Sequence, residues 1–184
     1  MKSHQIISLL NVINKKNIAI IGNMGCGKTA FGKLIAKKID YKHIDSDKKI
    51  VTLSKKSIND IFKEDGENYF RKIESKIVLN LIDKKNIILS LGGGSILSLA
   101  VRNKLIKNSL TVFLDVDLKI LVSRLRKSKH RPLLLNTNID KKIIELDIQR
   151  RKYYLKSDIK LSNTGDINNT YKIFKQEITK LYES

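Results

Sequence analysis

The sequence predicts an α/β protein with a three-layer α/β/α fold, in which a five-stranded parallel sheet lies between two layers of helices. Three observations predict this class. Short aliphatic runs alternate along the chain with longer segments of helical periodicity. Two of the runs, NIAII and NIILSL, are apolar enough to be strands buried on both faces. The unusual polar, glycine-rich and basic clusters come just after such runs, and parallel sheets bind ligands beyond the carboxyl ends of their strands.

The first predicted strand and helix are the clearest elements of the chain. The strand is NIAII at 17–21, and the helix spans 28–39 because its apolar side chains fall on one face. A second strand is expected at 42–45, where a short run ends in carboxylates. Two more helices are expected at 57–62, with Ser57 as N-cap, and at 67–82.

The second half of the chain repeats this alternation. A strand at 86–91 is stopped by three consecutive glycines, and a fourth strand follows at 110–115. The remaining expected elements are a helix at 118–125 with Asp117 as cap, a helix at 140–155, a short strand at 158–162 and a helix at 167–182.

The alternation runs without a Gly/Ser-rich or Pro-rich linker and therefore indicates a single domain, which we place at residues 17–184. Residues 1–16 precede it as an N-terminal extension and could form an extra helix. At about residues 127–138 the chain turns polar and basic around its only proline, Pro132, so we expect a loop or lid there.

Composition narrows the class of protein. With 41% hydrophobic and 30% charged residues among 184, the chain is neither disordered nor fibrous. No apolar run reaches the roughly 18 residues that a membrane span needs. Residues 1–16 lack the pattern of a secretory signal, and the single cysteine, Cys26, cannot form an internal disulfide. We therefore expect a cytoplasmic protein with no membrane partner, and a monomer.

The net charge of +19 could indicate nucleic-acid binding, but its distribution argues against that function. The 30 lysines are scattered through every segment with Asp and Glu between them, whereas a nucleic-acid site gathers basic residues on one stripe. Lys, Ile and Asn codons can be built from A and T alone, so a genome of low G+C content would produce the same charge. We expect no nucleic-acid partner. The seven arginines are more informative, because each persists in a chain that prefers Lys.

A phosphate-binding loop is predicted between the first strand and the first helix, where residues 22–29 match the pattern G-x-x-x-x-G-K-[ST]. Glycines let backbone N–H groups converge on a phosphate, and the helix N-terminus adds positive potential. Lys28 would reach the β- and γ-phosphates, and the Thr29 hydroxyl would ligate Mg²⁺. The residues expected to bind ATP here are Gly22, Asn23, Met24, Gly25, Cys26, Gly27, Lys28 and Thr29.

Cys26 lies inside this loop and has two interpretations. The favoured one is a small residue that fills a small buried space. The alternative is a thiol that the helix N-terminus and Lys28 activate, which would be sensitive to oxidation.

Three further clusters carry candidate chemistry. Asp45 and Asp47 end the second strand, and in extended chain this spacing points both carboxylates to one side; Asp47 could instead cap the next helix. The segment 66–74 places Arg71 among carboxylates, which could also be ordinary helix electrostatics. The glycines at 92–94 require either a close approach to the backbone or positive φ angles.

Together these clusters resemble the ordered signature of the shikimate kinases. In order, the signature here is GNMGCGKT, Asp-Ser-Asp, Gly-Glu-x-x-Phe-Arg-x-x-Glu, Gly-Gly-Gly, Arg131-Pro132-Leu133-Leu134 and Arg150-x-x-x-Tyr154. It covers most of the chain, from about Ile18 to Asp158; Cys26 departs from the Ala or Ser usual in the loop. The resemblance implies a P-loop fold of the nucleoside monophosphate kinase type. It also implies transfer of the ATP γ-phosphate to the 3-hydroxyl of shikimate, giving shikimate 3-phosphate and ADP in the chorismate pathway to aromatic amino acids.

The resemblance further implies how the nucleotide is held. Lys28 and Thr29 would handle phosphate and Mg²⁺, with Asp45 reaching the metal through water. Arg131, in the lid, would swing onto the transferred phosphate, and Arg124 would lie against the adenine.

For shikimate, the resemblance implies that Asp47 binds the ring hydroxyls and takes the proton of the attacking one. Arg71 and Arg150 would grip the carboxylate, while the backbone of Gly92, Gly93 and Gly94 would face the ring. The catalytic residues would be Lys28, Asp47 and Arg131.

Two questions stay open at this stage. Arg151 adjoins Arg150, and the spacing of the last motif favours Arg150 as the second carboxylate ligand. The alternative functions are a related kinase for another acid, such as gluconate, and a nucleotide-binding regulator or nucleic-acid-binding protein. Arg102 and Arg126 have no place in the implied site, and we expect them on the surface.

Overall fold

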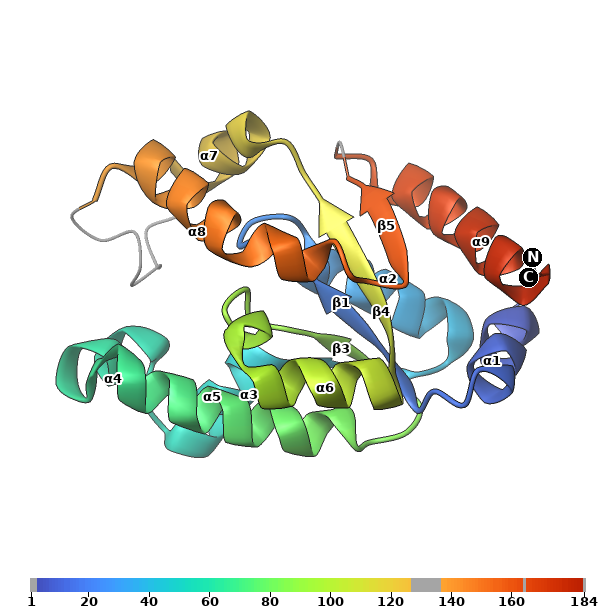
Figure 1. Ribbon diagram of the computed structural model, residues 1–184, viewed down its shortest axis with the longest axis horizontal. Coiled ribbons are helices and arrows are strands. Elements are labelled where there is room, and N and C mark those ends of the chain that lie inside the picture. Colours follow the sequence, from blue (N-terminus) through green and yellow to red (C-terminus); the bar gives the residue numbers. More distant parts are fainter. Residues whose placement is uncertain (1–2, 127–136, 164, 184) are drawn as a thin grey trace.

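The fold is a parallel sheet between two helical layers, as a computed structural model of residues 3–126, 137–163 and 165–183 describes it (Figure 1). Within these ranges the sheet has five strands in the order β2-β3-β1-β4-β5, and every neighbouring pair is parallel. The strands are β1 (Asn17–Ile21), β2 (Lys42–Asp45), β3 (Ile87–Ser90), β4 (Ser109–Asp115) and β5 (Ile159–Ser162). Since all strands run the same way, their carboxyl ends meet at one edge of the sheet.

The helices fill the connections between the strands and cover both faces of the sheet (Figure 1). Their bounds are α1 (Ser3–Val12), α2 (Lys28–Ile39), α3 (Ser46–Ser54), α4 (Ile58–Glu64), α5 (Gly66–Ile82), α6 (Leu99–Asn108), α7 (Leu118–Arg126), α8 (Ile139–Tyr154) and α9 (Ile167–Glu183), with a short 3₁₀ helix η1 (Ser95–Leu97).

Two hydrophobic cores lie on the two faces of the sheet. On one face α1, α2, α7 and α9 pack against the strands, and on the other face α5, α6 and the end of α8 do so. The β1 strand supplies both cores, because Ile18 and Ile20 enter the first and Ala19 and Ile21 enter the second. This double burial explains why its sequence is apolar without alternation.

The N-terminal extension forms a helix that belongs to the first core. In α1 the side chains of Ile6, Leu9 and Leu10 are buried among those of α2 and α9. The contact between α1 and α9 brings the two ends of the chain together, as Figure 1 shows.

The predicted strands and helices are all present, with Ser57 confirmed as the cap of α4 through its bond to the Asp60 backbone N–H. Two helices were not predicted. The first is α3, which buries only Ser46 and Ile50, so its sequence SDKKIVTLS carries almost no apolar periodicity. The second is α6, which starts behind an N-cap at Ser98. Most of the predicted lid lies outside the described residues.

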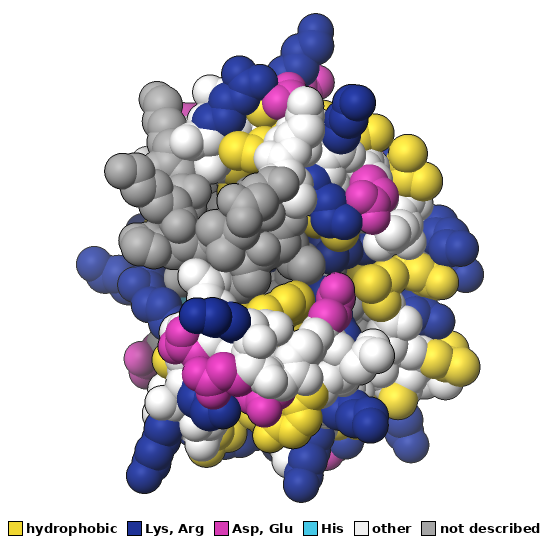
Figure 2. All heavy atoms as spheres, turned by 90° about the vertical axis from the view of Figure 1, so that its left-hand side faces the viewer, with side chains coloured by type: hydrophobic (Ala, Val, Ile, Leu, Met, Phe, Trp, Pro, Cys, Tyr) yellow, Lys and Arg dark blue, Asp and Glu magenta, His cyan; other side chains and the backbone are white. Residues whose placement is uncertain are grey.

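Among the described residues, none of the helices is both long enough and apolar enough to cross a bilayer. On the face drawn in Figure 2, Lys and Arg side chains occur around the outline and near the middle, with Asp and Glu among them.

Candidate active site

The predicted clusters converge at the carboxyl edge of three neighbouring strands. The phosphate loop 22–29 follows β1, Asp45 ends β2, and the glycines 92–94 follow β3. Because β3 lies between β2 and β1 in the sheet, the glycines sit between the carboxylates and the phosphate loop. Topology alone therefore brings together motifs that are 70 residues apart along the chain.

The phosphate loop has the strained backbone that its glycines allow. Gly22, Gly25 and Gly27 have φ angles of 140°, 80° and 99°, and a Cβ on Gly22 would lie 2.7 Å from the Leu114 carbonyl oxygen. The Lys28 Nζ turns back into the loop and donates to the carbonyl oxygens of Gly22 and Asn23, each at 2.8 Å. The ammonium is thus held over the concavity where phosphate oxygens bind.

Cys26 is 1% exposed and its Sγ lies 3.7 Å from the Lys28 Nζ. This burial agrees with the favoured interpretation of a small residue filling space.

We expect alkylation of Cys26 to be at least about 100-fold slower in the folded protein than in the urea-unfolded chain, because reaction requires the loop to open. ATP should slow the reaction further, since it binds only the closed loop. Labelling followed by mass spectrometry measures both rates. Equal alkylation rates with and without ATP would contradict the placement of the Cys26 thiol inside the phosphate loop.

The two residues predicted to hold Mg²⁺ touch each other. Thr29 Oγ1 donates to Asp45 Oδ2 at 2.6 Å. A hydroxyl and a carboxylate are the oxygen ligands that Mg²⁺ prefers, and this ion usually takes only one or two protein carboxylates together with phosphates and water. Accordingly, no group of three or more His, Cys, Asp or Glu side chains suited to a metal occurs in the described part of the chain.

Asp47 reaches the site from a helix, and the extended-chain argument for its direction was wrong. Ser46 already begins α3, and Asp45 rather than Asp47 is the N-cap, with its side chain accepting from the backbone N–H groups of Asp47 and Lys48. Asp47 in the first helical turn still faces the glycines: a Cβ on Gly92 would lie 2.5 Å from its Oδ1.

Gly92, Gly93 and Gly94 lie where the predicted site residues come closest to one another. None of them has a positive φ, so close approach is the reason for their presence. Gly92 faces Asp47, while a Cβ on Gly93 would lie 3.2 Å from Arg150 Nη1 and 3.4 Å from the Gly22 carbonyl oxygen. A Cβ on Gly94 would lie 2.1 Å from Arg71 Nη1. Any side chain here would displace a group that the predicted site requires.

Arg71 is held in place by two carboxylates on its own helix. Its Nη1 donates to Glu74 at 2.7 Å, and its Nη2 donates to Glu67 at 2.9 Å. Glu74 is 2% exposed and also accepts from Ser95 Oγ at 2.7 Å. Burial disfavours the charged guanidinium, but the two ion pairs outweigh it and raise the pKa of Arg71.

Arg150 and Arg151 have different environments, and this answers the question that the sequence left open about their positions. Arg150 is 2% exposed and faces Gly93, whereas Arg151 binds Asp115 through two bonds of 3.1 and 2.8 Å. Within the described ranges Arg150 has no ion pair, and its Nε is buried without a hydrogen-bond partner. Burial lowers the pKa of Arg150, and the nearby charge of Arg71 acts in the same direction.

Arg124 lies apart from the glycines 92–94. Arg124 Nη1 donates to the Gly25 carbonyl at 3.2 Å, and its Nη2 lies 3.8 Å from the position a Cβ would take on Gly165, so Arg124 is beside the phosphate loop. Arg131 is outside the described residues.

The gathered side chains line two hollows. One of about 490 Å³ is bordered by the phosphate loop, Asp45, Asp47 and Gly93, and the other, of about 340 Å³, by residues that include Arg71 and Gly94. Since Gly93 and Gly94 are adjacent, the hollows adjoin. The first hollow offers a site for phosphates, and the second offers the guanidinium group of Arg71.

Residues that sequence reasoning did not assign support the glycine turn. Tyr154 Oη donates to the Gly93 carbonyl at 2.7 Å, and Ser46 Oγ accepts from the Gly92 N–H at 2.8 Å. The sequence allowed an ordinary helix ion pair between Glu74 and Arg71. In the structure Glu74 does bind Arg71, but it is buried and also accepts a hydrogen bond from Ser95 Oγ. Glu74 is the last residue of the motif at 66–74, and that motif could have identified it as a residue of the site.

We expect Gly94→Ala to raise the KM for shikimate about tenfold or more, because the new methyl group would occupy the position of the Arg71 guanidinium. Gly94 has φ −89°, which alanine adopts freely, so the variant tests space rather than backbone strain. Steady-state kinetics with each substrate varied would measure the effect, and the KM for ATP is the internal control. An unchanged KM for shikimate would mean that Arg71 does not contact the substrate.

The parallel sheet, the phosphate loop and the carboxylates at the strand ends define a P-loop kinase that acts on a small molecule. Two guanidinium groups, those of Arg71 and Arg150, lie against its glycine turn. The family model for shikimate kinase matches residues 24–182, and the chain belongs to the shikimate kinase family, ATP-dependent kinases that transfer phosphate to shikimate.

Curated relatives support this membership over most of the chain. A shikimate kinase from Persephonella marina is 36% identical over 150 residues, covering 82% of this chain and 90% of that protein. A shikimate kinase from Buchnera aphidicola is 40% identical over 142 residues, covering 76% of this chain and 82% of that protein.

Solved structures have the same fold. Shikimate kinase from Acinetobacter baumannii in complex with shikimate superposes with a TM-score of 0.86 at 27% identity, covering 94% of this chain and 98% of that chain. A gluconokinase from Sinorhizobium meliloti has a TM-score of 0.55 at 16% identity, covering 91% and 94% of the two chains, and shares the fold alone.

Proposed function

We propose that this chain transfers the γ-phosphate of ATP to the 3-hydroxyl of shikimate, with Asp47, Arg71 and Arg150 as the residues that hold the acceptor. The observation that carries this assignment is the glycine turn at 92–94. Its three residues lie against the three proposed acceptor ligands, and Gly93 also lies against the phosphate loop. An acceptor seated on this turn would face the phosphate.

The charge balance at the turn supports a carboxylate-bearing acceptor. Two guanidinium groups converge there, and in the described part of the chain their ion pairs, with Glu67 and the buried Glu74, are all made by Arg71. Arg150 in particular is buried and without an ion pair in the same ranges. An unpaired buried charge is costly, and a substrate carboxylate between the two arginines would relieve that cost.

The nucleotide would occupy the hollow beside the phosphate loop. Lys28 would exchange its two carbonyl acceptors for phosphate oxygens, which carry full negative charge and bind an ammonium more strongly. Arg124, next to Gly25, would lie against the adenine. We assign Arg131 to the transferred phosphate from the family motif alone.

Thr29 and Asp45 would hold Mg²⁺, Asp45 through a water molecule. When bound, the ion would neutralise charge on the phosphate oxygens. The contact of 2.6 Å between the two side chains supports this pairing, because both oxygens can face one small cation.

In the transfer itself, the 3-hydroxyl oxygen of shikimate forms a bond to the γ-phosphorus while the bond from that phosphorus to the β–γ bridging oxygen breaks. The hydroxyl proton passes to Asp47, and ADP leaves with the bridging oxygen. Lys28 and Arg131 would stabilise the charge that spreads over the phosphoryl oxygens. Asp47 is suited to its role because it lines the same hollow as Lys28.

A coupled assay of ADP release over a panel of hydroxy acids tests this function. We expect turnover with shikimate, and little with gluconate, whose flexible chain cannot present a carboxylate and a ring hydroxyl in fixed relation. Thermal shifts with each acid separate binding from turnover. Turnover of gluconate at a rate equal to that of shikimate would contradict the proposal.

We also propose that the chain is a cytoplasmic monomer without a nucleic-acid partner. The single buried thiol of Cys26 supports a reducing compartment. Size-exclusion chromatography with light scattering, repeated with duplex DNA at near-physiological salt, tests the rest; co-elution with DNA would contradict it.

A further inference from the structure

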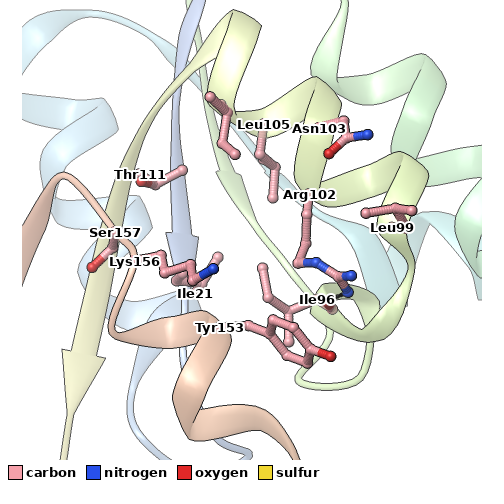
Figure 3. Close-up of a pocket in the computed structure, with 11 residues that line it drawn as sticks. Ile21, Ile96, Leu99, Arg102, Asn103, Leu105, Thr111, Tyr153, Lys156 and Ser157 are labelled. Carbon is pink, nitrogen blue, oxygen red and sulfur yellow. Dashed lines mark hydrogen bonds between the residues drawn. The ribbon is translucent and has the colours of Figure 1, made fainter.

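A third hollow lies on the other side of the glycine turn, between α6 and the turn that follows α8 (Figure 3). Its volume is about 220 Å³, and it shares no lining residue with the two hollows of the active site. The lining comes from the end of β1, from η1, α6 and β4, and from the end of α8 with the turn that follows it.

The wall of this hollow is mainly apolar. Ile21, Ile96 and Leu105 are buried at its base, and Leu99 and Ile106 stand 62% and 65% exposed at its rim. Leucine and isoleucine side chains this exposed beside a concave surface are typical of binding sites for apolar groups. Few polar groups at the base could serve a polyhydroxylated ring such as that of shikimate, because the Thr111 hydroxyl is already bound to Asp158.

The charged groups that line the hollow are both cationic. Figure 3 shows Arg102 and Lys156 extending toward it from opposite sides, with the Tyr153 ring beside Arg102. The Arg102 guanidinium lies 4.0 Å from the centre of that ring. Its Nη1 donates to the carbonyl oxygens of Ile96 and Leu97, both at 2.8 Å.

These contacts fix the plane of the Arg102 guanidinium and leave donors for a ligand. Among the described residues neither its Nε nor its Nη2 has a hydrogen-bond partner, and Lys156 has no ion pair. Arg102 therefore has a reason to be arginine in a lysine-rich chain, since a planar guanidinium can stack on Tyr153, bond two carbonyls and still bind an anion.

We propose that this hollow is a binding site for a small aromatic carboxylate. The ring would lie on the apolar wall beside the Arg102–Tyr153 stack, and the carboxylate would lie between Arg102 and Lys156. A volume of about 220 Å³ is below the usual size of drug-sized pockets and suits a single ring.

Occupation of this site would reach the active site through the backbone. The carbonyls that Arg102 holds belong to η1, which directly follows the glycine turn, and Tyr154, next to Tyr153, binds the Gly93 carbonyl. A ligand carboxylate bound to the remaining donors of Arg102 would pull on the same guanidinium that holds those carbonyls. Binding is therefore expected to change the KM for shikimate as well.

A titration of the whole protein with benzoate, followed by backbone amide NMR shifts, tests the proposal. Ionic strength is held constant with chloride, and saturating shikimate is present to occupy the carboxylate site at Arg71 and Arg150. We expect saturable shifts at residues 102–106 and 153–157. Benzamide, which has the same ring without the charge, is expected to bind at least about tenfold more weakly.

Two variants and one control make the result specific. Lys156→Gln and Arg102→Gln should each weaken benzoate binding about tenfold, because each removes a charge-assisted hydrogen bond. Lys107→Gln removes an exposed charge from α6 outside the hollow and should leave the affinity within about twofold. Lys156 is exposed and outside the active site, so this variant also guards against a folding defect in the Arg102 variant.

Three results would overturn the proposal: no saturable shift with benzoate, shifts centred on residues 92–94, or an unchanged affinity in Lys156→Gln. Shikimate turnover without benzoate stays near the wild-type rate in Lys156→Gln. A failure here is thus distinguishable from a failure of the proposed function.

Discussion

Asp47→Asn is expected to lower kcat by about 100- to 10,000-fold while leaving the affinity for ATP within about twofold. The amide has the size of the carboxylate but cannot take the proton of the attacking hydroxyl. Asp47 is the second residue of α3, and Asp45 is the N-cap of that helix, so the cap does not depend on the Asp47 side chain. Single-turnover kinetics give the chemical rate, and calorimetry with a non-hydrolysable ATP analogue gives the nucleotide affinity.

Asp40→Asn is the matched control for this variant. Asp40 ends α2 in a left-handed conformation that asparagine also adopts readily, and it is exposed. The Asp40→Asn substitution changes the net charge by the same amount at a position away from the proposed site, so it should leave kcat unchanged. If the Asp47→Asn protein kept most of the wild-type rate, Asp47 would not be the base.

Arg71→Lys is expected to lower kcat/KM for shikimate by roughly 30- to 1000-fold, about 2–4 kcal/mol of transition-state stabilisation. Lysine keeps the charge, but it cannot bind Glu74, Glu67 and a substrate carboxylate in one plane as the guanidinium can. The guanidinium also fills the space in which a Cβ on Gly94 would stand, a space that an ammonium would not fill. Kinetics with shikimate at saturating ATP measure the loss.

Arg151→Lys serves as the comparison because Arg151 has the same charge and lies on the same helix as Arg150, the other proposed carboxylate ligand. Its partners are Asp115 and Asp147, and it is 40% exposed, so we expect a loss of less than about 1 kcal/mol in stability and no change in KM for shikimate. If Arg71→Lys and Arg151→Lys behave alike, Arg71 does not bind the substrate carboxylate.

The fold could be predicted from the sequence where burial is two-sided or where local chemistry is strong. NIAII is apolar because both cores use it, and Gly27-Lys28-Thr29 marks the start of α2, so both elements have the predicted bounds. The arginines could be assigned because they stand out from a lysine background. The choice between Arg150 and Arg151 needed the structure, since only the helix rotation determines which of them faces Gly93.

The misplaced features depend on tertiary contacts that leave little trace in the sequence. The α3 helix buries one large apolar side chain, Ile50, so its periodicity is weak, and the sequence predicts extended chain at Asp47, where the helix has already begun. Glu74 has the spacing of a common surface ion pair, and only its burial against Ser95 and Gly92 makes it part of the site. The direction of Asp47 was predicted correctly for the wrong geometrical reason.

The double engagement of Asp45 limits how the metal site can be studied by mutagenesis. One carboxylate oxygen closes the first turn of α3, and the other binds Thr29. Alanine there would fray the helix that carries the base, at a cost of about 1 kcal/mol, so lost activity could not be attributed to the cation. Asparagine caps helices as well as aspartate does and is the cleaner replacement. Because one side chain contacts Thr29 and caps α3, a substitution of Asp45 would alter the proposed cation site and the first turn of the helix that carries Asp47 together.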